Sequence, residues 1–468
     1  MENDNQNQLA ESPTVASVPL QPPPKHKMKL WKKILMILVI LIIVIGAGIY
    51  FLPFILTVLH PGDATLIDDS QLTLQKVSVP DADNGFYDLN KITPTMINVP
   101  SNDQKIAFDL EYTDFTKPVQ WDQHLVDQVL SQNQQALSLF DAAAGKGHVQ
   151  VPDYANPINI NPNTAEPPTN TWRSAARLQA IKALSLSAQG KPDEALLEAA
   201  KLNKVGYNII NGHNGLIGVL VGLAIRQLGS QTILRILPFN NPGKQTLETV
   251  RTTLQDSSNN LEGYKDGFRF DYTNISNQIT QTVKDGDVSS FAYAKYAKYG
   301  YYYKPNQTKN LFTNLYNSQV AAIGVKCDLA ESNQQLNTTL SQFAVDISSR
   351  NLPFAENAIG KNLFSTFAVS LGSVVTKECQ NDLIANVAQI ELAIKEYEMD
   401  KGQLPNTLAE LVPQYLTAVP QDPFDHQPIR YSATKKILYS VGLKNQDLGG
   451  STGNDWTSMD NPTFQISF

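Results

Sequence analysis

The sequence is poor in the residues from which short catalytic and metal-binding motifs are built. Of its 468 residues, two are cysteines and six are histidines. The cysteines lack Cys-x-x-Cys spacing, and no two histidines form a close ligand pair or a His-Glu-x-x-His frame. The spacing therefore gives little support to a zinc site or a thiol redox site. A Gly-rich phosphate loop ending in Gly-Lys-Ser or Gly-Lys-Thr is also absent from the sequence.

Positive charge is scarce outside one short segment. The chain carries 37 Lys and Arg residues against 44 Asp and Glu residues, and its formal net charge is −7. A cluster of lysines stands near the beginning, at Lys25, Lys27, Lys29, Lys32 and Lys33. Nucleic-acid binding requires a clustered basic footprint, and the rest of the chain is acidic. We therefore expect no nucleic-acid partner.

What the sequence has instead is one long apolar run near its beginning. Residues 34–59 contain no charged side chain, and a helix of that length would extend roughly 39 Å, enough to cross the hydrocarbon core of a bilayer. Lysines precede the run, and Asp63, Asp68 and Asp69 come after it. Lysines mark the cytoplasmic side of a span. The sequence therefore predicts a single-pass cell-membrane protein with a cytoplasmic N-terminus, an extracytoplasmic C-terminal part, and an uncleaved signal-anchor rather than a cleaved signal peptide.

Composition divides the chain into five predicted segments. Asn, Gln, Ser and Pro dominate the first residues, and such a stretch without apolar periodicity is typical of disorder. After the apolar run, short apolar stretches alternate with Pro, Asp and Asn, and we expect this region to be a stalk that packs against the region after it. The predicted segments are a disordered cytoplasmic tail with the basic cluster (1–33), a transmembrane helix (34–59), an irregular stalk (60–120), a helical domain (121–360), and a long helix followed by a small α+β module (361–468).

Helical periodicity dominates the region between the stalk and the module. Apolar residues recur at helical spacing over 121–144 and over 171–237. Gly190 ends the first helix of the second stretch, and Pro192 suits the first turn of the next. The third helix, 216–237, is apolar on most faces, but Arg226 interrupts it, so we expect the core of a bundle rather than a second span. The predicted fold class is mainly α, with a helical bundle or hairpin domain.

One helical segment collects titratable side chains: Glu262, Asp266, Arg269 and Asp271. Paired carboxylates can perform acid–base chemistry when burial separates their pKa values. Far more often such groups form a solvated, salt-bridged helix face, and we expect the latter here.

The C-terminal residues carry a resemblance to a known family. A long helix ends in a Tyr-x-x-x-x-Gly-x-x-Pro pattern, an Asp-Pro-aromatic turn comes next, and then come a Ser-x-Gly strand and a Gly-Gly loop. This segment resembles the C-terminal half of the major pseudopilins of type II secretion systems, and the whole chain resembles uncharacterised membrane-anchored bacterial proteins with the same ending. The matching positions are Tyr397, Gly402, Pro405, Asp422, Pro423, Phe424, Ser440, Gly442, Gly449 and Gly450.

The resemblance implies a pseudopilin-like α+β module but not a filament subunit of the usual kind. Pseudopilins begin with a processed Gly, followed by an apolar helix that runs directly into the module. The apolar run of this chain lies far upstream of its module. Within the module, we expect Asn406 to cap a short helix over 407–415.

The last loop of the pseudopilin family commonly binds calcium through aspartates and backbone carbonyls. The resemblance implies that Asp447, Asp455 and Asp460 would be the metal ligands in this chain. However, Lys444 occupies the place of an acidic ligand, and its ammonium could neutralise the loop without a metal. A plain turn cluster of Gly, Asp and Asn is therefore the preferred interpretation, and calcium is the alternative.

Three function classes remain, one of which is a calcium-stabilised sensor. An anchor, a helical hairpin and a pilin-like ending predict a structural or interaction protein of the cell envelope: a scaffold, or an adaptor related to secretion or pili, with the lipid bilayer and a protein as partners. The alternative is an envelope-associated hydrolase that uses carboxylates such as Glu262 and Asp266. Cys327 and Cys379 both lie in the predicted extracytoplasmic part, where they could pair, but two unrelated buried thiols are about equally compatible with the sequence.

Overall fold

The computed structural model divides the chain into two compact units, Met1–Leu59 and His60–Phe468. The predicted disordered tail lies outside the described residues, except for its last few positions. The described residues are 29–75, 77–97, 115–119, 121–152, 167–258, 261–285, 299–328, 330–348, 351–368, 372–451, 454–458 and 460–468.

The described part of the first unit is essentially one helix, α1 (Leu30–Leu59), which covers the predicted span. Its most apolar window has a mean hydropathy of 3.1, and none of its residues is buried. Of the helices described, one other is long and apolar enough to cross a membrane, the region Gly215–Phe239, with a mean hydropathy of 1.4. Because 67% of that window is buried inside the second unit, we interpret it as a core helix, in agreement with the prediction from Arg226.

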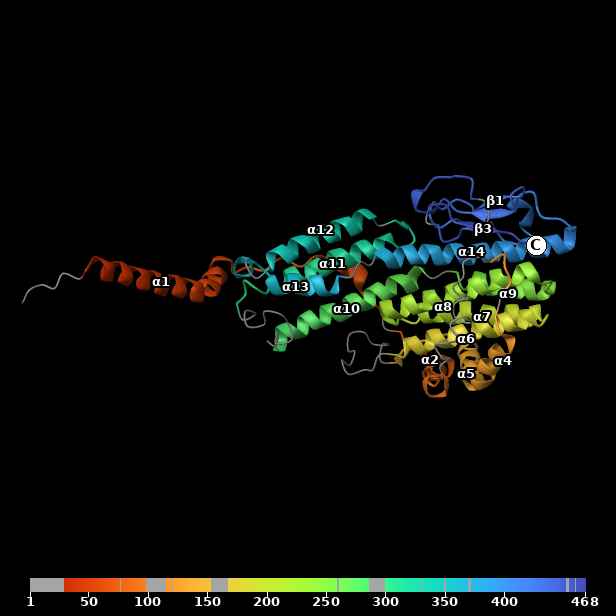
Figure 1. Cartoon of the computed structure of the whole chain (residues 1–468), viewed down its shortest axis with the longest axis horizontal. Helices are drawn as coiled ribbons and strands as arrows, with labels where there is room; N and C mark the ends of the chain where they lie inside the picture. Colours follow the sequence, from red (N-terminus) through yellow and green to blue (C-terminus); the bar gives the residue numbers. More distant parts are fainter. Residues whose placement is uncertain are drawn as a thin grey trace, which may run out of the picture. The chain divides into compact units, whose positions relative to one another are not determined.

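The second unit is mainly helical, as the sequence predicts (Figure 1). Short 3₁₀ turns connect several of the elements. The helices are α2 (Phe86–Asn90), α4 (Gln123–Gln132), α5 (Gln134–Ala144), α6 (Thr169–Ala188), α7 (Pro192–Ile210), α8 (Gly215–Ile236), α9 (Lys244–Asp256), α10 (Leu261–Asp285), α11 (Pro305–Ala322), α12 (Ala330–Asp346), α13 (Ala358–Phe367) and α14 (Gly372–Lys401).

Helices α6, α7 and α8 begin and end close to the predicted positions. Gly190, between α6 and α7, has a φ of +73°, a left-handed conformation that glycine adopts without a steric penalty. Pro192 opens α7, and Asp193 and Glu194 lie in its first turn, where the helix dipole favours negative charge. Helix α8 contacts α6, α7, α10 and α14, so it is the central helix of the bundle (Figure 1).

The predicted helix over 121–144 is broken into α4 and α5 at Asn133. The Asn133 side chain is buried and donates from Nδ2 to the carbonyl of Val129 at 2.9 Å. Its Oδ1 accepts a hydrogen bond from the N–H of Ile97 at 2.9 Å. An asparagine that bonds to nearby backbone groups competes with the helical ladder, which explains the break.

Helix α14 joins two hydrophobic cores. Its first turns pack with Phe312 of α11 and Phe364 of α13, whereas its later turns share a core with α5–α9 and with the C-terminal sheet. That sheet is antiparallel, in the order β1-β2-β3, and Leu438 and Phe464 are paired and buried within it. It lies beside α14 (Figure 1). The strands are β1 (Arg430–Ser432), β2 (Ile437–Tyr439) and β3 (Thr463–Gln465).

The predicted cap of the short helix in the module is shifted by one residue. The helix is a 3₁₀ turn, η10 (Leu408–Leu411), and Thr407 rather than Asn406 is its N-cap. Thr407 and Glu410 form a capping box, in which each side chain bonds to the backbone N–H of the other residue. Counting from Thr407 puts Glu410 at the third helical position, which is the acidic position of that motif.

The first residues of the stalk, 60–72, form an extended strap along α11. The Asp63 carboxylate accepts hydrogen bonds from the N–H groups of Asn306 and Gln307, at 2.7 and 3.0 Å, and so caps α11. Farther along α11, Asn310 donates to the carbonyl of Thr65 at 2.7 Å. The strap is therefore held in place by residues more than two hundred positions later in the chain.

Candidate functional site

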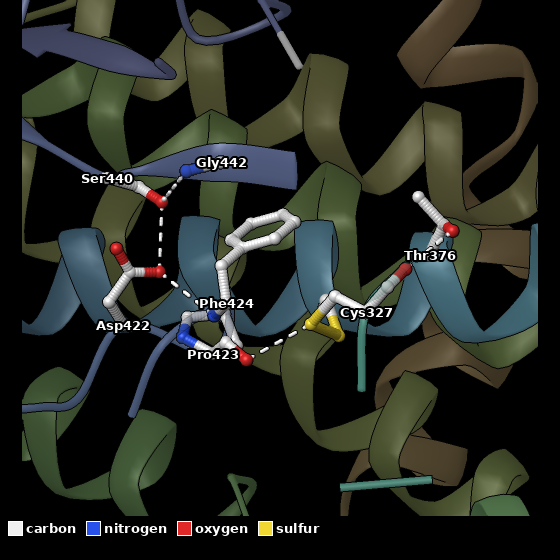
Figure 2. Close-up of a disulfide and its surroundings, with 8 residues drawn as sticks. Cys327, Thr376, Asp422, Pro423, Phe424, Ser440 and Gly442 are labelled. Atoms are coloured by element: carbon white, nitrogen blue, oxygen red, sulfur yellow. Dashed lines mark hydrogen bonds between the residues drawn. A yellow bond between two sulfur atoms is a disulfide. The ribbon is translucent and has the colours of Figure 1, made fainter. Parts of the chain in front are cut away.

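A disulfide ties α14 to the segment that comes after α11. Cys327 and Cys379 are bonded, with their Cα atoms 5.8 Å apart, which answers the question that the sequence left open. The Sγ of Cys327 lies 3.0 Å from the carbonyl oxygen of Pro423, in the Asp-Pro-aromatic turn of the module. Thr376 of α14 donates to the carbonyl of Cys327 at 2.9 Å (Figure 2). The disulfide thus joins α14 to the segment after α11 beside the module, and disulfides typically stabilise a fold by about 2–4 kcal/mol.

Asp422 organises the module next to the disulfide. Its side chain is fully buried, and its Oδ1 accepts hydrogen bonds from Ser440 Oγ at 2.9 Å and from the N–H of Phe424 at 3.1 Å (Figure 2). Ser440 Oγ in turn accepts from the N–H of Gly442 at 3.0 Å. Arg430 pairs with Asp422 at 3.0 Å. Burial raises the pKa of Asp422, and the hydrogen bonds from Phe424 and Ser440 oppose that rise. The carboxylate therefore connects the Asp-Pro-aromatic turn to the Ser-x-Gly segment of the predicted pattern.

The other residues of the pseudopilin-like pattern also have structural roles. Tyr397 donates from its hydroxyl to Glu410 Oε2 at 2.6 Å and so connects α14 to η10. Gly402, Gly449 and Gly450 have φ values of +74°, +76° and +67°, which other residues adopt only with strain. These positions build turns and anchor the module, and they do not converge on a reactive centre.

The aspartates proposed as calcium ligands make separate contacts in the structure. Asp460 forms an ion pair with Lys444 at 2.5 Å, which is the neutralisation expected from the position of that lysine. An oxygen of Asp447 lies 3.8 Å from Arg430 Nε, and Asp455 forms an isolated bridge with β3. Within the described part of the chain, no three His, Cys, Asp or Glu side chains gather closely enough to hold a metal ion.

The carboxylates of the hydrolase hypothesis lie in an ion-paired patch on α10. Arg269 Nη1 contacts Glu262 Oε2 at 2.9 Å and Asp266 Oδ1 at 2.7 Å, and Lys265 contacts Glu262 at 2.9 Å. Glu262 is 68% exposed at its side chain. Hydrogen bonds from Lys265 and Arg269 lower the pKa of Glu262, whereas a general acid needs a raised one. This arrangement is a salt-bridged helix face, and it lends no support to catalysis by these two residues.

Asp271, from the same segment, is buried beside the N-terminus of α8. Its Oδ1 accepts a hydrogen bond from the N–H of Leu216 at 3.3 Å, and burial raises the pKa of Asp271 to about 7. It lines a cavity of about 180 Å³ together with Asn214 and Asn274. That volume is below the range of small-molecule sites. We interpret Asp271 as a cap supplied to α8 by α10.

A second buried polar group lies where α8, α10 and α14 meet. Arg226 Nη1 contacts Asp382 Oδ1 at 2.5 Å and Tyr264 Oη at 3.2 Å, and the Arg226 side chain is 1% exposed. Burial disfavours the charged guanidinium, but Asp382 outweighs that effect and raises the pKa of Arg226. Glu378 lies one turn before Asp382, and burial, together with the charge of Asp382, raises the pKa of Glu378 to about 8. This cluster connects three helices; burial raises the pKa of Glu378, whereas the charge of Asp382 raises the pKa of Arg226.

The loop before β3 contains one spacing that fits a nucleophile elbow, Gly-Gly-Ser-Thr-Gly at 449–453. An elbow needs its Ser at a sharp turn from a strand into a helix. Ser451 instead lies in the loop between the 3₁₀ turn η11 (Gly442–Lys444) and β3, and its N–H donates to Thr463 Oγ1 at 3.0 Å. The spacing alone does not make Ser451 a nucleophile.

Comparisons of the chain with protein-family models, with curated proteins and with solved structures found no match.

Proposed function

We propose that the protein is a membrane-anchored, extracytoplasmic structural and interaction protein, an envelope scaffold or adaptor. The observation that carries this proposal is α1, a 30-residue helix with no buried residue and no charge after Lys33. In water such a helix would expose a large apolar surface, whereas in a bilayer it satisfies its own backbone. Lys29, Lys32 and Lys33 at its start favour a cytoplasmic N-terminus.

The disulfide supports the proposed compartment. Disulfides form and persist in oxidising surroundings and are rare in a reducing cytosol. The Cys327–Cys379 bond belongs to the second unit, which comes after the anchor in the chain. An extracytoplasmic second unit would both follow the anchor in the chain and lie where a disulfide persists.

The strap, residues 60–72, supports a mechanical role for the anchor. It comes directly after α1 in the chain and is bonded along α11 rather than left as a free linker. Lys309 pairs with Asp69 at 2.7 Å, and Tyr272 donates to Asp69 at 2.6 Å. Leu72, at the end of the strap, is buried in the core with α10 and α11. A tether fastened in this way passes force from the anchor to the helical body, as a scaffold requires.

The membrane anchor and the compartment can be tested together in full-length protein expressed in bacteria. We expect alkaline carbonate to leave the protein in the membrane, and alkaline phosphatase fused after Phe468 to be active, because that enzyme needs an oxidising compartment. Cys327 and Cys379 should resist alkylation until a reductant is added. The matched control lacks residues 30–59 and should give soluble protein and an inactive fusion. Release of the full-length chain by carbonate, or an inactive full-length fusion, contradicts the proposal.

The interaction role requires a protein partner, and the module is where the resemblance to pseudopilins would put one. Leu448 is an apolar side chain in the Gly-Gly loop and is 56% exposed. We expect a photo-crosslinking residue at Leu448 to give a discrete crosslinked product in native membranes. The control position is Lys191, at the start of α7, whose exposed side chain should give none. Recovery of the monomer alone from both variants would count against a scaffold or adaptor.

A further inference from the structure

The second unit begins at His60, the residue directly after α1. The imidazole ring of His60 lies against the ring of Tyr301, with ring centroids 5.4 Å apart. Lys304 Nζ donates to the carbonyl of His60 at 3.3 Å. One end of the second unit is therefore fixed to the residue that follows the proposed anchor. Because the chain is continuous between Leu59 and His60, this end lies at the extracytoplasmic surface of the membrane when α1 spans the bilayer.

A later segment of the chain is held at the same end. The N–H of Asn357 donates to the carbonyl of Tyr301 at 2.8 Å, and the Tyr301 hydroxyl donates to the carbonyl of Phe354 at 2.7 Å. Asn357 Oδ1 accepts from the N–H of Lys304 at 2.9 Å. Lys304 also pairs with Glu356 at 2.7 Å. These bonds place Phe354 in the same cluster as the first residue of the second unit.

Two apolar side chains at this end are exposed. Phe354, the last residue of the 3₁₀ turn η9 (Leu352–Phe354), is 66% exposed. Val345, in the last turn of α12, is 55% exposed. The carbonyl of Val345 accepts a hydrogen bond from Asn351 Nδ2 at 3.1 Å, so Val345 lies close to η9. We call Val345, Phe354 and His60 the anchor-side end.

Exposure alone does not identify a partner, because a second turn of the same Leu-Pro-Phe sequence also exposes its phenylalanine. This turn is η7 (Leu237–Phe239), and Phe239 is 45% exposed. Lys244, shortly after η7, pairs with Asp400 in the last turn of α14. Helices α11, α12 and α13 lie toward one end of the second unit and α9 toward the other (Figure 1). What distinguishes Phe354 from Phe239 is its position beside the first residue of the second unit.

We propose that the anchor-side end docks on the extracytoplasmic surface of the bilayer, with Phe354 and Val345 inserted among the lipid headgroups. The proposal rests on the proposed function, which puts α1 in the membrane. Apolar side chains at the boundary between headgroups and acyl chains lose their contact with water, which favours insertion.

Two ion pairs lie beside the inserted side chains. Lys304 pairs with Glu356, and Lys361 pairs with Asp346, the residue after Val345, at 2.6 Å. Within each pair the two charges cancel, so insertion does not depend on a charged lipid. A bilayer of zwitterionic lipid is therefore the partner that the experiment uses.

The experiment uses full-length protein in nanodiscs of phosphatidylcholine, either unmodified or brominated on the acyl chains, because bromine quenches tryptophan fluorescence on contact. The chain has four tryptophans, and Trp31 lies in α1. In a Trp31→Phe background, the variant is Phe354→Trp and the matched control is Phe239→Trp. Both phenylalanines are exposed, so neither change should disturb the fold. We expect brominated lipid to remove most of the fluorescence that Phe354→Trp adds and to leave the fluorescence that Phe239→Trp adds.

A second set of variants tests whether the two apolar side chains insert together. Val345→Trp in the same background should also be quenched by brominated lipid. Adding Phe354→Asp should lower that quenching, because a carboxylate enters the boundary of the bilayer only at a high cost. Adding Phe239→Asp instead puts the same charge at the other exposed turn and should leave the quenching unchanged.

Failure of the docking can be distinguished from failure of the proposed function. The fluorescence of Trp31, obtained as the difference between the wild type and Trp31→Phe, reports whether α1 is inserted, and brominated lipid should quench it. Quenching of Trp31 without quenching of Phe354→Trp overturns the docking and leaves the anchor in place. If neither is quenched, both proposals are wrong. Equal quenching of Phe354→Trp and Phe239→Trp also overturns the docking, because the anchor-side end would then not be the part that faces the bilayer.

Discussion

Valine in place of Gly222 is expected to remove most of the stability of the helical body. Gly222 lies where α8 crosses α7, and a Cβ atom there would stand 2.7 Å from the carbonyl oxygen of Gly206 and 2.6 Å from Cγ1 of Ile210. The contact is reciprocal, since a Cβ on Gly206 would stand 2.6 Å from the carbonyl oxygen of Gly222. Backbone atoms can yield only if the two helices separate. We expect the free energy of unfolding to fall by about 4 kcal/mol or more.

This loss can be measured by chemical denaturation of the full-length protein, monitored by circular dichroism. The control is Ala224→Val, which puts the same side chain on an exposed position of the same helix and should cost less than about 1 kcal/mol through helix propensity alone. If the free energy of unfolding of Gly222→Val lies within about 1 kcal/mol of that of the wild type, the close approach of α7 and α8 is not a feature of the folded protein.

The parts of the fold that the sequence predicts well depend on local signals. The boundaries of α6 and α7 follow from Gly190 and Pro192, which act through the backbone of their own turns and need no distant partner. The central position of α8 follows from its composition, apolar on most faces with one interrupting arginine. The mainly helical class and the apolar N-terminal helix can therefore be predicted from local composition and periodicity.

The predicted helix boundaries are wrong where side-chain hydrogen bonds to nearby backbone groups decide where a helix begins or breaks. Asn133 breaks a predicted helix because its amide bonds both the preceding turn and Ile97. Thr407, and not the predicted Asn406, caps the short helix. The Thr407 hydroxyl bonds to the backbone N–H of Glu410, and the Glu410 carboxylate bonds to the backbone N–H of Thr407. Both choices depend on hydrogen bonds worth about 1 kcal/mol, which composition cannot rank.

Contacts between distant segments were not predictable from local pattern. The sequence left the pairing of Cys327 and Cys379 undecided, because only the fold brings α14 to the end of α11. The cleft between α6, α8 and the loop that carries Trp456 was missed for the same reason, because its lining residues are separated by most of the domain.

Replacing Arg226 with methionine is expected to cost about 3 kcal/mol, because it leaves the largely buried Asp382 carboxylate, 21% exposed, without its partner. In the described structure only one guanidinium nitrogen of Arg226 is bonded, and its Nε and Nη2 are buried without a hydrogen-bond partner. Its main role is therefore to neutralise Asp382, which faces the buried Glu378 on the same helix. The variant would leave two neighbouring carboxyl groups at the junction of α8, α10 and α14.

The sign of the pH dependence distinguishes this charge effect from a loss of packing. Without Arg226, the pKa of Asp382 in the folded state rises further above its ordinary value of 3.8, so the folded protein binds a proton more tightly than the unfolded chain does. The free energy of unfolding of the variant then falls as the pH rises from the ordinary pKa of Asp382 to its raised pKa in the folded state. The fall is up to about 1.4 kcal/mol per pH unit for one carboxyl group. The deficit of Arg226→Met relative to the wild type should therefore be larger at pH 8 than at pH 5.

The double variant Arg226→Met with Asp382→Leu completes the test. Removing both charges leaves no unpaired ion, and apolar replacements of similar volume are often neutral or stabilising at buried ion pairs. Most of the lost stability should return, and the pH dependence that Asp382 adds should disappear, since the carboxyl group that causes it is gone. A double variant as unstable as Arg226→Met would mean that the shape of the arginine, and not its charge, holds the three helices together.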